Sequence, residues 1–147
     1  MACAHQLEVT DQASVDRFVG HAEARHGRVD VLVNTAGRLD EADTVRFEHM
    51  SAEAAAALFA VDVLGAMRMC HAVIPHMRRH GRGAIINFSS AINWVPVTYC
   101  AAKGAIRSFT APLARDIAPE IRVNALTPAG YINGQVIHVE GGWVPAG

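Results

Sequence analysis

Tyr99 and Lys103 lie four residues apart in the segment YCAAK, which has the composition of a helix. On a helix, residues at this spacing share one face and their side chains lie one turn apart. A free tyrosine titrates near pH 10, and a neighbouring ammonium group favours its ionised form. Such a tyrosine can exchange a proton with a substrate oxygen near neutral pH. The pair therefore predicts acid–base chemistry, the alternative being an ordinary solvent-exposed helix face.

Ser89 and Ser90 precede this pair, at the end of the apolar run GAIINF. The run is typical of a buried strand, so the serines are expected at its carboxyl end. Either hydroxyl could there hold the substrate oxygen that exchanges a proton with Tyr99. The alternative is that both hydroxyls only satisfy backbone groups where the strand ends.

The elements that must position these residues alternate along the chain. Apolar runs predict strands at residues 5–10, 29–34, 83–89, 121–128 and 134–142. Helical spacing of apolar residues predicts helices between Asp11 and Gly27, over residues 52–79 after the cap Ser51, and from Thr98 to about residue 118, with a weak point at Pro112. This alternation indicates right-handed βαβ units and a three-layer α/β fold.

Composition narrows the class of protein. The chain has 147 residues, 51% hydrophobic and 18% charged, with a net charge of −1, which indicates one globular domain and favours neither nucleic acid nor an anionic membrane. We expect no stretch to reach the length of a membrane span. The three widely spaced cysteines indicate reduced thiols and a cytoplasmic protein. His76 and His80 have metal-ligand spacing, but their basic neighbours favour a solvated helix end, so no metal is expected.

Seven motifs in order resemble the short-chain dehydrogenase/reductase family: LEVTD (7–11), NTAG (34–37), AVIPHM (72–77), GAIINFSS (83–90), YCAAKGAIRSFT (99–110), RVNALTPAG (122–130) and GQVIHVEGG (134–142). The resemblance implies a Rossmann-like parallel sheet over residues 1–147. It also implies an oxidoreductase that moves a hydride between NAD or NADP and a small carbonyl or alcohol substrate.

The resemblance also assigns roles to residues. Tyr99 becomes the general acid or base, Lys103 lowers its pKa and holds the nicotinamide ribose, and Ser90 positions the substrate oxygen. Asp62 stands where the family has an asparagine, and a carboxylate there would favour a charged Lys103 and change the proton relay. The cofactor-binding residues implied are Asp11, Asn34, Ala36, Gly37, Tyr99, Lys103, Pro128 and Gly130. For Asn34 the alternative is a role at the strand end without cofactor contact.

Three departures from the family pattern stand out. No glycine-rich phosphate loop is present, Ser90 precedes Tyr99 by only nine residues, and TPAG runs directly into YINGQ without the usual substrate loop. These departures support an alternative: an impaired or inactive truncated member that serves only as an oligomerising domain. A recorded sequence that lacks part of the protein is a third explanation.

The departures also affect the sheet and the surface. Loss of the first strands leaves the strand at 29–34 with a bare edge, so we expect residues 5–10 or a second chain to pair with it. The long helix at 52–79 is apolar nearly all round, which favours a homo-oligomer, either dimer or tetramer.

Overall fold

The structure is a computed structural model that describes residues 3–90 and 96–127. Its centre is a parallel sheet of β1 (Val31–Asn34), β2 (Gly83–Phe88) and β3 (Ile121–Leu126), in the order β1-β2-β3. Leu32 pairs with Ile85, and Ile85 with Val123. The Rossmann-like parallel sheet predicted from the sequence is therefore confirmed. The strand expected at 134–142 lies outside the described residues, as do Pro128 and Gly130.

The first helix, α1 (Gln12–His26), begins and ends where its capping residues predict. The Asp11 carboxylate accepts hydrogen bonds from the backbone N–H groups of Ala13 and Ser14, and Gly27 closes the helix with a φ of 78°. A left-handed backbone conformation at this position favours glycine. Val15 and Val19 are buried on the side of α1 that packs against the long helix that follows in the chain.

That long helix consists of α2 (Ala52–Phe59), the π-helical segment η3 (Ala60–Gly65) and α3 (Ala66–Arg79). Ser51 caps it by accepting from Ala54 N at 3.0 Å. The run Ala52–Arg79 is long and apolar enough to cross a membrane by length and composition, and 44% of its most apolar window is buried inside the protein. The expectation that no stretch reaches this length was therefore wrong, although the core helix of a soluble protein has the same properties.

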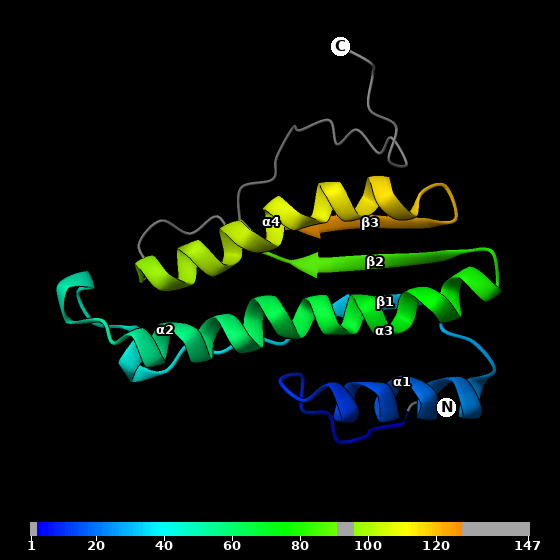
Figure 1. The fold of residues 1–147 in the computed structure, drawn as a ribbon, viewed down its shortest axis with the longest axis horizontal. Helices are drawn as coiled ribbons and strands as arrows, with labels where there is room; N and C mark the ends of the chain where they lie inside the picture. Colours follow the sequence, from blue (N-terminus) through cyan, green and yellow to red (C-terminus); the bar gives the residue numbers. More distant parts are fainter. Residues whose placement is uncertain (1–2, 91–95, 128–147) are drawn as a thin grey trace, which may run out of the picture.

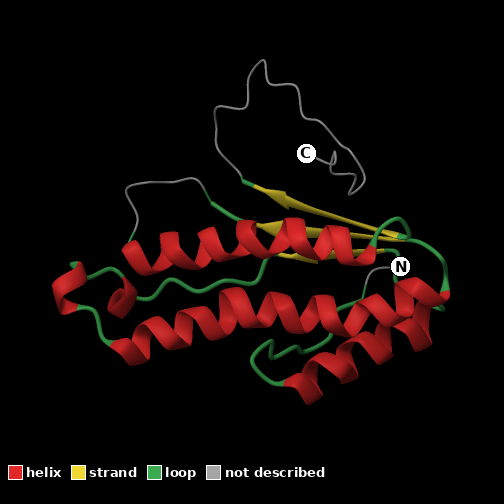
Figure 2. Ribbon diagram, turned by 45° about the horizontal axis from the view of Figure 1, so that its top comes forward, coloured by secondary structure: helices red, strands yellow, loops and turns green. Residues whose placement is uncertain are grey.

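The remaining helix, α4 (Val97–Ile117), contains Pro112 and lies over β3 beside α3 (Figure 1). Figure 2 shows the three strands along one side of the helices. The burial of the strands alternates accordingly: Leu32, Ile85 and Val123 face the core, whereas Val31 and Val33 are 53% and 46% exposed. Among the described residues, helices thus cover one sheet face, and the second helical layer of the predicted three-layer fold is not found there.

Residues 5–10 do not form the strand that was expected. The segment is instead fixed by local contacts: Glu8 N donates to Ser14 Oγ at 3.0 Å, and Arg68 donates to Val9 O at 3.4 Å. Val9 also packs so closely on Gly65 that a Cβ there would lie 2.8 Å from the valine side chain. Contacts with the two helices therefore replace strand pairing, and within the described residues β1 pairs only with β2. The expectation that residues 5–10 pair with the edge of β1 was wrong, and its alternative, a second chain on this edge, stays a prediction.

Candidate active site

The centre of the site is a buried ion pair between α4 and the π-helical segment. Lys103 Nζ lies 2.9 Å from Asp62 Oδ2, and the exposed fractions of the two side chains are 8% and 0%. The same ammonium lies 3.5 Å from the carbonyl oxygen of Phe88, near the carboxyl end of β2. Lys103 therefore joins three elements where the first two strands end.

Asp62 reaches this point because the chain widens into a π-helical turn. Such turns are rare within α-helices and are frequent at functional sites. The second carboxylate oxygen, Oδ1, accepts the backbone N–H of Arg38 at 2.8 Å. One side chain thus ties the loop after β1 to the helix that carries Lys103.

Gly37 lies directly over this ion pair. A Cβ at Gly37 would lie 3.1 Å from Asp62 Oδ2 and 3.4 Å from Lys103 Nζ. The first separation is tighter than an ordinary side-chain contact and the second is at its limit, so a larger residue would press on Asp62. The absence of a side chain leaves room above the ammonium group, on the exposed surface of the loop after β1.

Tyr99 shares the face of α4 with Lys103, as their spacing predicts. Lys103 Nζ lies 5.4 Å from the centroid of the Tyr99 ring, which is within the range of a cation–π contact. The ring packs against a small apolar cluster formed by Leu58, Val63 and Ala102. The long helix and α4 together therefore hold the phenol next to the ammonium group.

The two serines have different surroundings. Ser89 is 4% exposed, its hydroxyl donates to the carbonyl oxygen of Lys103 at 2.7 Å, and its backbone N–H donates to Leu126 O at 2.8 Å. This hydroxyl therefore fastens the end of β2 to α4. Ser90 is half-buried and keeps its place as the candidate for holding a substrate oxygen.

Asn34 belongs to a polar network inside the protein. Its Nδ2 donates to Asn87 Oδ1 at 2.9 Å, and Asn87 Nδ2 donates in turn to Thr110 Oγ1 at 3.1 Å. The Asn34 amide also lies 3.4 Å from Cys70 Sγ, and burial raises the pKa of that thiol to about 11. The side chain of Asn34 therefore links β1 to β2 and α3, and Asn87 extends the network to α4. The contact of Asn34 with a cofactor stays a prediction.

The other residues implied by the resemblance lie in separate places. Asp11 uses its carboxylate to cap α1 and lies 3.8 Å from Arg17. Ala36 and Gly37 are exposed in the loop after β1, and Gly37 reaches the ion pair. The structure thus brings Gly37, Asp62, Tyr99 and Lys103 together, and places the carboxylate of Asp11 at the start of α1.

Sequence reasoning missed two partners of the site, the backbone N–H of Arg38 and the carbonyl oxygen of Phe88. Neither has a side-chain signal, because both act through the backbone. It also missed the contact of His76 Nδ1 with Glu23 Oε2, at 2.7 Å, which crosses from α3 to α1. Within residues 3–90 and 96–127, no group of three or more His, Cys, Asp or Glu side chains could hold a metal ion.

The sequence model described as short chain dehydrogenase matches residues 1–138. The chain belongs to the short-chain dehydrogenase family. Sorbitol dehydrogenase of Cereibacter sphaeroides is 39% identical over 140 residues, which cover 91% of this chain and 53% of the relative. The chain thus spans about half the length of the curated relatives that it matches.

Solved structures of family members superpose closely on this fold. An aldohexose dehydrogenase of Thermoplasma acidophilum aligns with a TM-score of 0.78 at 29% identity, covering 84% of this chain and 49% of that one. A gluconate 5-dehydrogenase of Burkholderia cenocepacia, solved with NADP and tartrate, aligns with a TM-score of 0.75 at 31% identity, covering 82% and 48%. These homologues are consistent with an NAD(P)-dependent oxidoreductase.

The family implies a nicotinamide cofactor, and the residues present fit one end of it. Gly37 leaves the space above the ion pair that a side chain would fill. Lys103 offers an ammonium donor there, which suits the hydroxyl groups of a ribose. Among the described residues no glycine-rich turn at a helix amino-terminus provides a cradle for the pyrophosphate. The described residues therefore fit the nicotinamide and its ribose, and not the pyrophosphate of the cofactor.

Proposed function

We propose that this chain carries the proton-transfer half of an NAD(P)-dependent oxidoreductase that interconverts a small alcohol and a carbonyl compound. The observation that supports it most is the Lys103 ammonium, 2.9 Å from Asp62 and 5.4 Å from the Tyr99 ring, at the carboxyl end of a parallel sheet. Ligands of open α/β sheets bind outside this end of the strands. The chemistry of these side chains and the family agree on the class of reaction.

In this proposal Tyr99 takes the hydroxyl proton of the alcohol, or returns it to the carbonyl oxygen in the reverse direction. A bound nicotinamide supplies the hydride donor or acceptor. Lys103 holds the ribose with its ammonium group. Ser90 donates a hydrogen bond to the substrate oxygen. Gly37 and Ala36 line the cofactor, and Pro128 and Gly130 are expected beside it.

The names of the relatives suggest the first substrates to test. Sorbitol, aldohexoses and gluconate appear among them, so polyols and sugars with secondary hydroxyl groups form a suitable panel. Turnover is measured by the absorbance of the reduced nicotinamide, with NAD and NADP in parallel.

Replacing Tyr99 with Phe keeps the aromatic ring and removes the hydroxyl proton. We expect Tyr99→Phe to lower turnover by about 10²-fold or more, in line with the loss of a general acid–base group.

A conservative change at an exposed position of the same helix, Ser108→Ala, serves as the control and should keep wild-type turnover. Equal turnover of Tyr99→Phe and the wild type would overturn the assignment of Tyr99.

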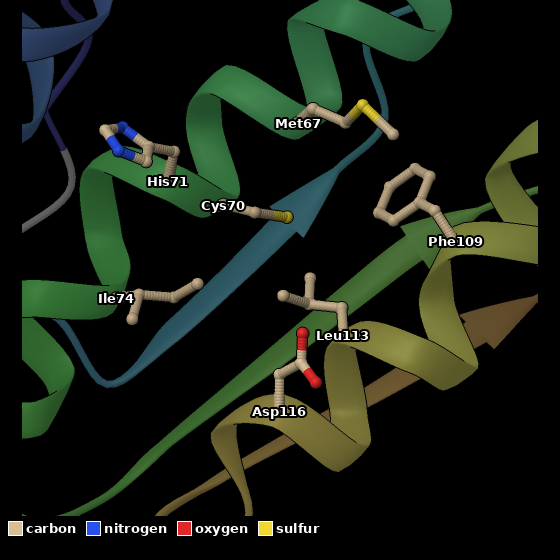
Figure 3. A pocket seen from close by; sticks show the side chains of 7 residues that line it. All are labelled: Met67, Cys70, His71, Ile74, Phe109, Leu113 and Asp116. Carbon is tan, nitrogen blue, oxygen red and sulfur yellow. The ribbon is translucent and has the colours of Figure 1, made fainter.

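The outer groove between α3 and α4 supports a proposal about assembly. It has a volume of about 280 Å³ and is lined by Met67, Cys70, His71, Ile74, Phe109, Leu113 and Asp116. Figure 3 shows Ile74 from α3 and Phe109 and Leu113 from α4 bordering this groove. We infer that a second copy of the chain covers it, giving a dimer or tetramer. Cys3 and Cys70 are thiols rather than disulfide partners, which supports the inference of a cytoplasmic location.

A further inference from the structure

We propose that Asp62 is a positioning residue that fixes the ammonium group of Lys103 against the loop after β1, through the two oxygens of a single buried carboxylate. The proposal rests on the proposed function for its consequence in catalysis, but the contact itself can be tested without cofactor or substrate. It concerns the charge of Asp62, which an asparagine at this position would not provide.

The geometry provides the first argument. Asp62 Oδ2 lies 2.9 Å from Lys103 Nζ, while Oδ1 accepts the backbone N–H of Arg38 at 2.8 Å. The carboxylate is completely enclosed, and the lysine side chain is 8% exposed. Solvent screens a buried ion pair much less than a surface pair. Movement of the ammonium group away from Oδ2 would leave a buried carboxylate without its counter-ion, which is strongly unfavourable.

The surrounding charges provide the second argument. Arg38 directs its guanidinium group away, with Nη2 on Asp40 and Nε 3.6 Å from Asp43, so it contributes only its backbone N–H to Asp62. Asp62 therefore has one cationic partner among the described residues, Lys103. On the other side of Nζ are the Tyr99 ring and the carbonyl oxygen of Phe88, neither of which carries a full negative charge while the phenol is protonated. Asp62 is thus the counter-ion of Lys103.

The charge of Asp62 fixes the position of the Lys103 ammonium group relative to both Tyr99 and the cofactor. An ammonium group held beside a buried carboxylate has a fixed position. Preorganised donors cost no rearrangement when a ligand binds. Without the charge of Asp62, the flexible four-carbon stem of Lys103 can place Nζ elsewhere. We expect an asparagine to keep the bond from Arg38, because an amide oxygen still accepts, and to lose the hold on Lys103.

The chain offers an unusually clean probe, because Lys103 is its single lysine. Protein labelled with ¹⁵N at the lysine side chain will show one ammonium signal in a proton–nitrogen correlation spectrum. Burial and ion pairing slow proton exchange, so the wild type should give a sharp signal near neutral pH. In Asp62→Asn this signal should broaden beyond detection or shift, with the circular dichroism spectrum unchanged.

Asp43→Asn is the matched control. Asp43 is also buried and contacts Arg38, but it has no contact with Lys103. This variant should keep the wild-type ammonium signal. An unchanged signal in Asp62→Asn, or an equal change in both variants, would overturn the proposal.

A second measurement protects the test against a variant that does not fold. Acetylation of the single lysine in the wild-type protein, followed by mass spectrometry, should be at least tenfold slower in native than in urea-unfolded protein. Equal rates in the two states would overturn the proposal independently of any substitution.

A fluorescence titration with NADPH and NADH tests the effect of Asp62 on dinucleotide binding. Asp62→Asn should weaken dinucleotide binding by roughly tenfold, the loss expected for one misplaced hydrogen bond from a charged group. Asp43→Asn should bind as the wild type does. If the ammonium signal behaves as predicted but the wild type binds neither dinucleotide, the positioning role stands and the proposed function fails. Unaltered binding in Asp62→Asn would overturn the consequence for catalysis.

Discussion

At the scale of single residues, the site depends on one lysine with several partners. Lys103 contacts a carboxylate from the π-helical segment, a carbonyl oxygen from β2 and the ring of Tyr99 on its own helix. Each partner comes from a different turn or element, so the ammonium group has a fixed place only when the whole fold is present. This dependence explains why the spacing of Tyr99 and Lys103 alone is a weak signal.

The buried thiol of Cys70 makes the stability of the protein depend on alkaline pH. Burial raises the pKa of its thiol from 9.0 to about 11. The unfolded chain ionises this thiol above its ordinary pKa, whereas the folded protein keeps it neutral up to the raised value. The stability contributed by the neutral thiol is therefore complete below about pH 9 and is lost as the pH rises towards 11.

Comparison of urea unfolding at several alkaline pH values checks this expectation. Between pH 9 and 11, the wild type should lose roughly 2–3 kcal/mol more of its free energy of unfolding than Cys70→Val does. Parallel loss in the two proteins would show that the buried thiol plays no part in the alkaline transition.

At the scale of elements, sequence patterns predicted most of the helices and strands. Asp11, Gly27 and Ser51 act as caps where local chemistry placed them, because capping depends only on neighbouring residues. The helix that carries Tyr99 and Lys103 and the strand before it were also predictable from motif order. The π-helical turn at Asp62 left no such signal, since its residues fit an α-helix equally well.

Long-range contacts decided two features at this scale. The pattern of residues 5–10 suits a strand, but a strand needs a partner, and Val9 instead packs on Gly65 while the backbone N–H of Glu8 donates to Ser14 Oγ. The run at 29–34 contains the predicted strand, yet Val31 and Val33 are exposed on the sheet face that no described helix covers. Neither outcome can be read from local sequence.

The contact between α1 and α3 through Glu23 likewise could not be predicted from local sequence. Glu23 on α1 binds His76 and Arg79 on α3, far away in sequence. The hydrogen bond from His76, followed by that from Arg79, lowers the pKa of the Glu23 carboxyl. The sequence indicated only a basic helix end at His76, because the carboxylate that meets it comes from another helix.

At the scale of the whole molecule, the chain spans about half the length of its relatives and yet contains Tyr99 and Lys103, the residues to which we assign proton transfer. The outer groove between α3 and α4 presents apolar side chains, including Met67 with 41% exposure. We expect light scattering to show an oligomer at micromolar concentration. Met67→Asp should shift it towards the monomer, because a buried unpaired charge opposes association.

Phe47→Asp provides the control for this experiment. Phe47 is 61% exposed in a short 3-10 helix, η2 (Phe47–His49), before α2 and does not line the groove. It should leave the oligomeric state unchanged. A wild-type protein that remains monomeric across the micromolar range would contradict assembly through this groove.

A fluorescence titration of the purified chain with NADH and NADPH tests most directly whether Lys103 marks a binding site for a nicotinamide dinucleotide. We expect saturable binding in the micromolar range that is lost in Lys103→Ala and retained in Arg107→Ala, which removes an exposed cation from the same helix. A titration of the wild type that does not saturate at millimolar dinucleotide would contradict a dinucleotide site at Lys103.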